Sequence, residues 1–232
     1  MSCADLKGKV YFLTGAGSGQ GRATAISLAG QGAKLGLLDM RYPQDTLDEI
    51  AKNGATVEKF GQLDGAANLA GWIGTQGFKG KGYALDVIKD EDWDRMMAVN
   101  LNGVRNSLST EMRYIRDGGS IVNIASIAGQ RGSPWNAPYG AAKWGVISLT
   151  KSAAQELGSK NVRVNAIAPG VIDTALATAL GDPDVVFQRM VSRCALQWMG
   201  QPQEIANCIL FFFSDVSSFV SGSVINADGG FQ

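Results

Sequence analysis

Residues 10–21 read Val10-Tyr-Phe-Leu-Thr14 followed directly by Gly15-Ala-Gly-Ser-Gly-Gln-Gly21. The apolar run predicts a buried strand, and a helix is expected to begin at the end of the glycine-rich turn. Glycines there let the backbone approach a pyrophosphate, and the helix N-terminus offers free N–H groups to the phosphates. A plain turn is the alternative, but the position between strand and helix favours nucleotide binding. The candidate contacts are Gly15, Gly17, Ser18, Gly19, Gln20 and Gly21.

Beyond this turn, short apolar runs alternate with helical stretches, a pattern typical of a parallel sheet covered by helices on both faces. We expect strands at 10–14, 34–39, 65–68, 120–125, 162–167 and 223–226. We expect helices at about 20–31, 44–60, 90–116, 138–158 and 202–214. The fold class is therefore α/β, a doubly wound parallel sheet in a single domain over 1–232. Segment 174–200 breaks the alternation and is predicted to be an insertion over the carboxyl edge of the sheet, where open sheets bind ligands.

The composition excludes several function classes. The 232 residues carry 21 Lys and Arg against 21 Asp and Glu, which argues against an electrostatic partner such as nucleic acid or a membrane surface. The chain contains no histidine. Ser-His-Asp and Cys-His centres, histidine zinc sites and a histidine general base are thereby excluded. Acid–base chemistry must use Asp, Glu, Lys, Tyr or Cys.

The three cysteines, Cys3, Cys194 and Cys208, are far apart and form no C-x-x-C pair, so we expect neither a disulfide framework nor a metal site. The first ten residues lack the apolar stretch of a secretory signal. No apolar run approaches the ~20 residues of a membrane span. We therefore expect a cytoplasmic protein.

Asp39 ends the second expected strand, about 20 residues beyond the glycine turn. A carboxylate at this position can accept both ribose hydroxyls of NAD and repels the additional phosphate of NADP. The alternative is a surface acid that closes the strand, and Arg41 lies two residues further on. NAD is favoured over NADP.

Tyr139 and Lys143 stand four residues apart on one expected helix, so that the phenol and the ammonium share a face. An ammonium beside a phenol is expected to lower the tyrosine pKa toward the operating pH. Ser126 follows the expected strand 120–125, where its side chain can project into the ligand crevice. Each of these features alone occurs by chance in many proteins.

Further motifs continue in order along the chain: Asn68-Leu-Ala-Gly71, Asn100-Leu-Asn-Gly103, Tyr139-Gly-Ala-Ala-Lys143, Asn165-Ala-Ile-Ala-Pro169-Gly170 and Asp228-Gly-Gly230. Together with the glycine turn and Ser126, they resemble the short-chain dehydrogenase/reductase family over nearly the whole chain. The order and spacing agree, so the match is far more specific than any single motif. The resemblance implies a Rossmann-like fold and a small-molecule substrate.

The resemblance also implies roles for individual residues. The implied catalytic set is Asn100, Ser126, Tyr139 and Lys143. Tyr139 would give or take the hydroxyl proton, Ser126 would bond the substrate oxygen, and Lys143 would hold the nicotinamide ribose. Asn100 would lie at a helix kink and position a water in the proton relay. The further cofactor contacts, to which Tyr139 and Lys143 also belong, would be Asn68, Ala70, Gly71, Pro169, Gly170, Ile172 and Thr174.

The chain departs from the family in two places. Gln20 stands where family members usually carry an aliphatic residue. The larger departure is the interval from Asp39 to Asn68, where the family's two βα units need about 45 residues and one needs roughly 24. The interval here is 29 residues, so one outer βα unit is predicted to be missing between 40 and 64. Either the adenine pocket is open on one side, or the expressed protein contains a stretch that this sequence lacks.

The aromatic residues Trp72, Trp135, Phe187 and Trp198 suggest an apolar or aromatic substrate, although each can equally serve core packing or an interface. Arg131 and Arg193 are candidates for meeting a substrate carboxylate. The resemblance implies a homotetramer, or a homodimer, built on helices 90–116 and 138–158. The leading hypothesis is an NAD-dependent oxidoreductase that interconverts a secondary alcohol and a ketone. The alternatives are a cofactor-binding or regulatory protein with little turnover, and an enzyme that reduces an imine or catalyses a non-redox step.

Overall fold

The computed structural model describes residues 6–52, 61–76, 81–178, 181–182, 184–185 and 189–232. Its strands are β1 (Val10–Thr14), β2 (Lys34–Leu38), β3 (Leu63–Asn68), β4 (Ile115–Ile124), β5 (Arg163–Pro169) and β6 (Val224–Ala227). Its α-helices are α1 (Gly19–Gly30), α2 (Gln44–Lys52), α3 (Asp90–Met97), α4 (Gly103–Tyr114), α5 (Ala137–Glu156), α6 (Ala175–Thr178) and α8 (Pro202–Phe213). A π-helix, η2 (Ala98–Asn102), joins α3 to α4, and short 3₁₀ helices include η3 (Ile127–Gly129) and η5 (Val191–Arg193).

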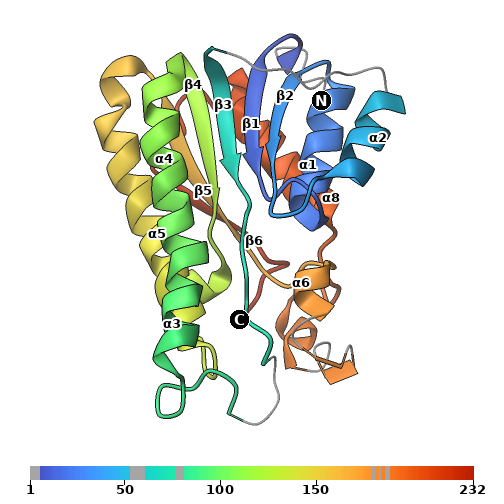
Figure 1. Ribbon diagram of the computed structural model, residues 1–232, viewed down its shortest axis with the longest axis vertical. Helices are drawn as coiled ribbons and strands as arrows, with labels where there is room; N and C mark the ends of the chain where they lie inside the picture. The colour runs from blue at the N-terminus through green and yellow to red at the C-terminus, as the bar shows by residue number, and fades with distance from the viewer. Residues whose placement is uncertain (1–5, 53–60, 77–80, 179–180, 183, 186–188) are drawn as a thin grey trace.

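The strands form one parallel sheet in the order β2-β1-β3-β4-β5-β6. Helices α1, α2 and α8 lie on one side of it, and α4 and α5 lie on the other (Figure 1). One apolar core fills the space under α1 and α8 around Leu13, Leu28 and Phe212, and a second lies under α4 and α5 around Ile121 and Val146. The predicted doubly wound α/β sheet is confirmed.

One helix, α2, stands between β2 and β3 in the described chain, and β3 pairs directly with β1. Within the described residues β2 therefore forms the edge of the sheet, which confirms the predicted loss of one outer βα unit. Thr46 of α2 is buried and its hydroxyl donates a 3.0 Å hydrogen bond to the carbonyl of Ala16, so α2 is tied to the glycine turn. Residues 53–60 of the expected helix 44–60 lie outside the described residues.

Two expected boundaries were wrong. The expected helix 90–116 passes through the π-helix η2 and ends at Tyr114, and β4 begins at Ile115 rather than at Ser120. Ile115 is buried and pairs with Leu63, and the register shifts before Ser120, because the polar and glycine-rich residues 116–119 form an irregular start of the strand. These intervening residues carry no apolar pattern from which a strand could be predicted.

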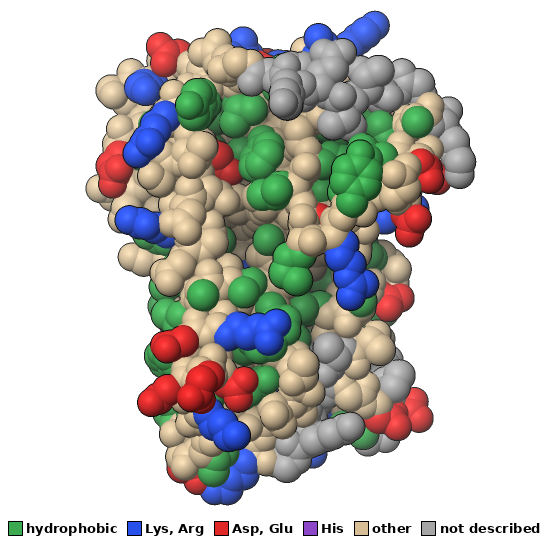
Figure 2. All heavy atoms as spheres, viewed as in Figure 1, with side chains coloured by type: hydrophobic (Ala, Val, Ile, Leu, Met, Phe, Trp, Pro, Cys, Tyr) green, Lys and Arg blue, Asp and Glu red, His purple; other side chains and the backbone are tan. Residues whose placement is uncertain are grey.

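The carboxyl ends of the strands open toward one end of the molecule, and α6 lies beyond them (Figure 1). Of segment 174–200, helix α6 lies beyond this edge of the sheet. Figure 2 shows acidic side chains gathered beside basic ones over α3, with hydrophobic side chains across the middle of the same face. No helix among the described residues is both long and apolar enough to cross a membrane.

Candidate active site

Helix α5 carries Tyr139 and Lys143 on one buried face. The helix begins at Ala137 with Pro138 in its first turn, where the missing N–H of proline is tolerated. Tyr139 is 8% exposed and Lys143 is buried, and the Lys143 Nζ lies 5.6 Å from the centroid of the Tyr139 ring. The Nζ donates a 2.8 Å hydrogen bond to the carbonyl of Ile124 in β4. The expected Tyr–Lys neighbourhood is thus present, with the ammonium anchored to the sheet.

Ser126 lies two residues beyond the end of β4 and precedes the short helix η3. Its backbone is extended, and its Oγ accepts a 3.2 Å hydrogen bond from the backbone N–H of Ala128. The Ser126 and Tyr139 hydroxyls are also hydrogen-bonded to each other. Strand β4 and helix α5 therefore bring together a hydroxyl and a phenol that are 13 positions apart in the sequence.

Burial shifts the pKa of Tyr139 and the pKa of Lys143 in opposite directions. Loss of solvent raises the pKa of Tyr139 to about 12, although the hydrogen bond with Ser126 acts to lower it. The same loss of solvent lowers the pKa of Lys143 to about 8. The predicted lowering of the tyrosine pKa was therefore wrong for this state of the protein, because spacing indicates the nearby ammonium but not the depth of burial.

Asn100 lies inside the π-helix η2, which is the interruption between α3 and α4 where a kink was expected. Its side chain is fully buried. The Oδ1 accepts a hydrogen bond of 3.0 Å from the backbone N–H of Trp72, and the Nδ2 donates one of 2.7 Å to the Trp72 carbonyl. The Nδ2 also donates to the carbonyl of Met96 at 3.0 Å. Asn100 thus joins the helix interruption to the chain that follows β3.

The Asn68–Gly71 turn is held between β1 and this helix interruption. The backbone N–H of Ala70 donates to the Thr14 hydroxyl at 3.3 Å. A Cβ placed on Gly71 would lie 3.3 Å from the Asn100 Oδ1 and 3.9 Å from the Lys143 Nζ. Glycine at position 71 therefore allows the turn, the asparagine and the lysine to come together.

The glycine turn after β1 is built for close backbone approach. Gly15 has φ of +72°, and a Cβ there would lie 2.6 Å from the backbone nitrogen of Ala70. A Cβ on Gly21 would lie 2.0 Å from the carbonyl oxygen of Gly15, which no side chain could tolerate. The Gly17 N–H donates a 2.9 Å hydrogen bond to the carboxylate of Asp39. The predicted acid at the end of β2 thus meets the middle of the turn.

Helix α1 begins directly behind this turn with an uncapped end. Ser18 is the N-cap residue but accepts no capping hydrogen bond, and the first turn, which contains Gln20, has no acidic residue. Its first N–H groups therefore lack intrahelical partners and can meet an anion. A Cβ on Gly19 would lie 3.0 Å from the Thr174 Cγ2, so the chain after β5 borders the same turn.

The remaining predicted cofactor residues follow β5. Pro169 ends the strand and pairs with Ala227, and a Cβ on Gly170 would lie 2.8 Å from the Cα of Asp228. Ile172 is buried and forms a bridge with Gly200. Residues 169–174 thus connect the end of β5 to the glycine turn and to the closing Asp228-Gly-Gly230 segment.

These observations test whether a nicotinamide dinucleotide fits. At one end, two glycine positions that exclude a Cβ, the uncapped start of α1 and the Asp39 carboxylate suit a pyrophosphate and an adenosine ribose. At the other end, Gly71, Asn100 and Lys143 meet beside Tyr139 and suit the nicotinamide ribose. The described residues fit this cofactor. Met40 and Tyr42, at the adenine end, are 92% and 78% exposed.

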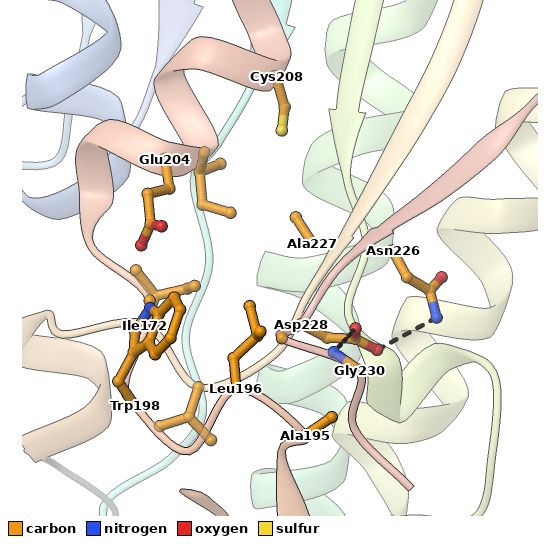
Figure 3. A pocket seen from close by; sticks show the side chains of 14 residues that line it. Ile172, Ala195, Leu196, Trp198, Glu204, Cys208, Asn226, Ala227, Asp228 and Gly230 are labelled. Carbon is orange, nitrogen blue, oxygen red and sulfur yellow. Dashed lines mark hydrogen bonds between the residues drawn. The ribbon is translucent and has the colours of Figure 1, made fainter.

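A cavity of about 470 Å³ opens between β6, the first turns of α8 and residues 195–200. Figure 3 shows Leu196 between Trp198 and Asp228 among the side chains that line it. Asp228 accepts hydrogen bonds from Asn226 and from the Gly230 N–H, at 3.2 and 3.0 Å, so its carboxylate is already engaged. None of the predicted catalytic residues lines this cavity.

The other predicted substrate residues lie in different surroundings. Trp72 packs in an apolar cluster with Tyr139, and the Arg95 guanidinium lies 4.5 Å from its ring centroid. Trp135 is half-exposed with φ of +60°. Arg131 and Arg193 both lie over the Phe231 ring and donate to backbone carbonyls of the C-terminal residues, rather than to an open site. Phe187 lies outside the described residues.

Two residues near the site escaped the sequence analysis. Tyr83 is buried against Tyr139 in the same cluster, and its hydroxyl accepts a hydrogen bond from the Thr75 N–H at 3.1 Å. It belongs to an aperiodic loop, which gives no pattern to read. Glu111 of α4 is buried against Asn68. A glutamate in an amphipathic helix normally indicates the solvent-exposed face, so the sequence pattern of α4 predicts an exposed Glu111 where the structure buries it.

A family model and several known proteins are similar to this chain in sequence. A family model described as enoyl-(acyl carrier protein) reductase matches residues 54–232. The 3-oxoacyl-[acyl-carrier-protein] reductase FabG of Thermotoga maritima is 36% identical over 252 positions, covering 97% of this chain and 98% of the relative. The alignment has 252 positions although it includes only 97% of the 232 residues, so this chain is gapped against the relative, which agrees with a shortened chain.

Other relatives and a solved structure agree. The short-chain dehydrogenase/reductase ABA4 of Pyricularia oryzae is 39% identical, covering 97% of this chain and 92% of the relative. The cyclohexanol dehydrogenase of an Acinetobacter species is 36% identical, covering 96% and 94%. A putative 2-deoxy-D-gluconate 3-dehydrogenase of Agrobacterium tumefaciens, solved with bound NADP, superposes with a TM-score of 0.87 at 31% identity, covering 99% of this chain and 98% of that one.

Proposed function

The chain belongs to the short-chain dehydrogenase/reductase family and is an oxidoreductase acting on CH–OH or C=O groups, and on this premise we propose its finer activity. We propose that it interconverts a secondary alcohol and a ketone on an apolar or aromatic small molecule, with NAD as cofactor and Tyr139 as the general acid/base. The observation that carries this proposal is the meeting of Ser126 with the buried Tyr139 and Lys143 at the carboxyl edge of the sheet.

A nicotinamide cofactor held along the glycine turn, Gly71 and Lys143 supplies the hydride chemistry. Tyr139, protonated at neutral pH because its pKa is about 12, donates the phenol proton to the substrate oxygen in the reducing direction. The Ser126 hydroxyl, which lies beside the Tyr139 hydroxyl, donates its proton to the same oxygen and stabilises the developing alkoxide. The Lys143 ammonium stabilises the phenolate that remains. Asn100 holds the Trp72 backbone beside this centre.

The preference for NAD rests on Asp39. Its carboxylate stands beside the Gly17 N–H, where it can accept ribose hydroxyls and where a ribose phosphate would meet a like charge. A family neighbour was solved with NADP, so the preference is a property to be tested for this chain. Arg41 is exposed two residues beyond the acid and is the cation nearest in sequence that could favour NADP.

The apolar character of the substrate rests on the surroundings of Tyr139. Trp72, Ile73 and Tyr83 pack with Tyr139 in one cluster, so the phenol is approached past aromatic and aliphatic side chains. A relative that acts on cyclohexanol supports a secondary alcohol on an apolar ring. We also propose a homotetramer or homodimer built on α4 and α5, since Tyr114 and Trp144 are half-exposed on these helices, and a cytoplasmic location.

The decisive experiment screens secondary alcohols with NAD and ketones with NADH, including cyclohexanol and a 3-oxoacyl ester, and follows the absorbance of NADH. Tyr139→Phe removes one hydroxyl and should reduce kcat by about 10²- to 10⁴-fold, the usual contribution of a general acid/base, while NAD still binds. Turnover in this variant within tenfold of wild type would refute the proton-transfer role. NAD binding without turnover of any substrate would favour the binding or regulatory alternative, which the exposed end of β2 motivates.

A further inference from the structure

A row of buried polar side chains crosses the sheet beneath the Asn68–Gly71 turn. The Asn68 Nδ2 donates to the Asn123 Oδ1 at 2.9 Å and to the Glu111 Oε2 at 3.0 Å. The Asn123 Nδ2 donates to the Thr150 hydroxyl at 3.0 Å, and that hydroxyl donates to the Val146 carbonyl at 2.8 Å. The row therefore ties β3 to β4, α4 and α5.

Two atoms of this row have no hydrogen-bond partner, and they belong to residues already in contact. The Glu111 Oε1 and the Asn68 Oδ1 are both buried, and neither has a partner among the residues that the structure describes. A carboxylate oxygen and an amide oxygen only accept hydrogen bonds, so neither can satisfy the other while Glu111 is ionised. An unsatisfied buried polar atom is costly, and two in one pair are unusual.

We propose that Glu111 is a positioning residue that holds Asn68 as an uncharged carboxylic acid, through a ring of two hydrogen bonds. The acid proton on Oε1 would be donated to the Asn68 Oδ1, and the Asn68 Nδ2 already donates to Oε2. One proton thus satisfies both unpartnered atoms. The inference rests on the proposed function only where it concerns the cofactor site.

Burial and charge around Glu111 support the neutral form. The residue is 2% exposed, and burial raises the pKa of its carboxyl to about 7, although the Asn68 hydrogen bond acts to lower it. No charged group counts among the causes of this shift within the described residues. The titratable groups on α4 and on the elements packed against it are Asp64, Arg105, Arg113, Tyr114, Arg116, Asp117, Tyr139, Lys143, Lys151 and Glu156.

The pair bears on the active site through Asn68. This residue ends β3 and leads into Leu69, Ala70 and Gly71, and the turn is bound to Thr14 on one side. On the other side Gly71 borders Asn100 and Lys143. A charged Glu111 would draw in water or turn away, and Asn68 would lose a fixed partner at the base of the nicotinamide end. The protonation state of Glu111 therefore acts on cofactor affinity without touching the cofactor.

Infrared difference spectroscopy over pH 5–9 tests the acid directly, on the wild-type protein without cofactor. We expect a carbonyl band of a buried protonated acid that fades as the pH rises through about 7 and is missing in Glu111→Gln. The unfolding free energy should also fall from about pH 4.5 to about pH 7 and level off above it, because between these two pKa values the folded state holds a proton that the unfolded chain has lost. Glu111→Gln, which supplies an N–H donor in place of the acid proton, should remove this fall. Glu156→Gln, the same change at an exposed site on α5, should not.

Calorimetric titration with NAD tests the positioning role. From pH 6 to pH 8.5, wild-type affinity should fall by about threefold to tenfold more than the affinity of Glu111→Gln, the worth of roughly one hydrogen bond. Lys143, whose pKa is about 8, contributes the same pH dependence to both proteins. If Glu111→Gln kept the infrared carbonyl band of wild type and the same fall of the unfolding free energy with pH, the acid–amide ring would be overturned. Equal pH dependence of NAD affinity in both proteins would overturn the positioning role. The spectroscopic and unfolding results do not involve the cofactor, so they stand apart from failure of the proposed function.

Discussion

The proposed catalytic site and the proposed adenine site differ in how deeply their residues are buried. Asn100, Ser126, Tyr139 and Lys143 come from η2, the loop after β4, and α5, and three of the four are buried. At the adenine end, the chain after β2 leaves Met40 and Tyr42 largely exposed. The chemistry needs convergence of several elements in a dry site, and the adenine contact does not.

The difference in burial between the two sites follows from the position of the missing outer βα unit, between β2 and β3. Removing an outer βα unit leaves β1 with neighbours on both sides, β2 and β3, so the strand that carries the glycine turn keeps its ladder. The loss falls on β2, which becomes the edge of the described sheet. A sheet can be trimmed at its edge without disturbing the strands that position Tyr139.

Replacing the buried lysine should have the largest effect of the variants in this comparison. Lys143→Met should lower kcat/KM by at least about 10²-fold, because the phenolate formed on Tyr139 loses its cation. At pH 7 the unfolding free energy of Lys143→Met should exceed that of wild type by about 1–3 kcal/mol. Burial lowers the pKa of Lys143 to about 8, so the folded wild-type protein holds a buried ammonium at a cost that the variant avoids. NADH absorbance and urea denaturation measure the two effects.

The pH dependence supplies the control. Between the folded pKa of about 8 and the ordinary 10.5, the unfolded chain binds the additional proton, so wild-type stability rises with pH across this window. The gap between Lys143→Met and wild type should therefore narrow toward pH 10.5. A gap that stays constant would mean that the ammonium is not destabilising, and that its burial is compensated by a partner.

A pair of glycine variants in α1 tests how rigid the phosphate turn is. Gly21→Ala places a methyl group 2.0 Å from the carbonyl oxygen of Gly15, and overpacking of this kind typically costs about 1–3 kcal/mol. Gly30→Ala, in the same helix, meets nothing within 4 Å apart from its chain neighbours and its own helix backbone, and should be neutral or stabilising by up to about 1 kcal/mol. The thermal unfolding midpoints of both variants measure how closely the glycine turn is packed. Equal midpoints would contradict the close packing of strand and helix.

Charge at the end of β2 is expected to have a smaller effect. Asp39→Asn keeps an oxygen that can accept from the Gly17 N–H but removes the negative charge. We expect the ratio of NAD to NADP affinity to fall by about tenfold or more, roughly the worth of one charge-assisted hydrogen bond. Asp39→Ala, which removes the acceptor as well, should also loosen the turn and lower the affinity for both cofactors. An unchanged ratio in Asp39→Asn would show that cofactor choice lies elsewhere.

Sequence reasoning succeeded where local patterns and topology agree and failed where burial decides. The run Val10–Thr14 with its glycines predicts β1 and α1 almost to the residue, and the short interval to Asn68 predicts the trimmed sheet. The predicted direction of the Tyr139 pKa shift was wrong, because the four-residue spacing places the ammonium beside the phenol but does not show how deeply the phenol is buried. Glu111 was missed for the same reason: its partner Asn68 is 43 positions away, and only the fold brings them together.

The smallest effect is expected from the exposed chain at the adenine end. Met40→Ser and Tyr42→Ser should each change the unfolding free energy by less than about 0.5 kcal/mol, as is usual for exposed positions. If the pocket is open on this side, the exposed side chains bury little against adenine, and NAD affinity should change less than about threefold, well under 1 kcal/mol. Calorimetry with NAD, and with AMP as a probe of the adenine half alone, distinguishes an adenine pocket that is open on this side from one that residues 40–42 close. A tenfold loss of AMP affinity in either variant would show that this exposed chain closes over the base, and that the trimmed sheet has rebuilt its adenine wall from residues 40–42.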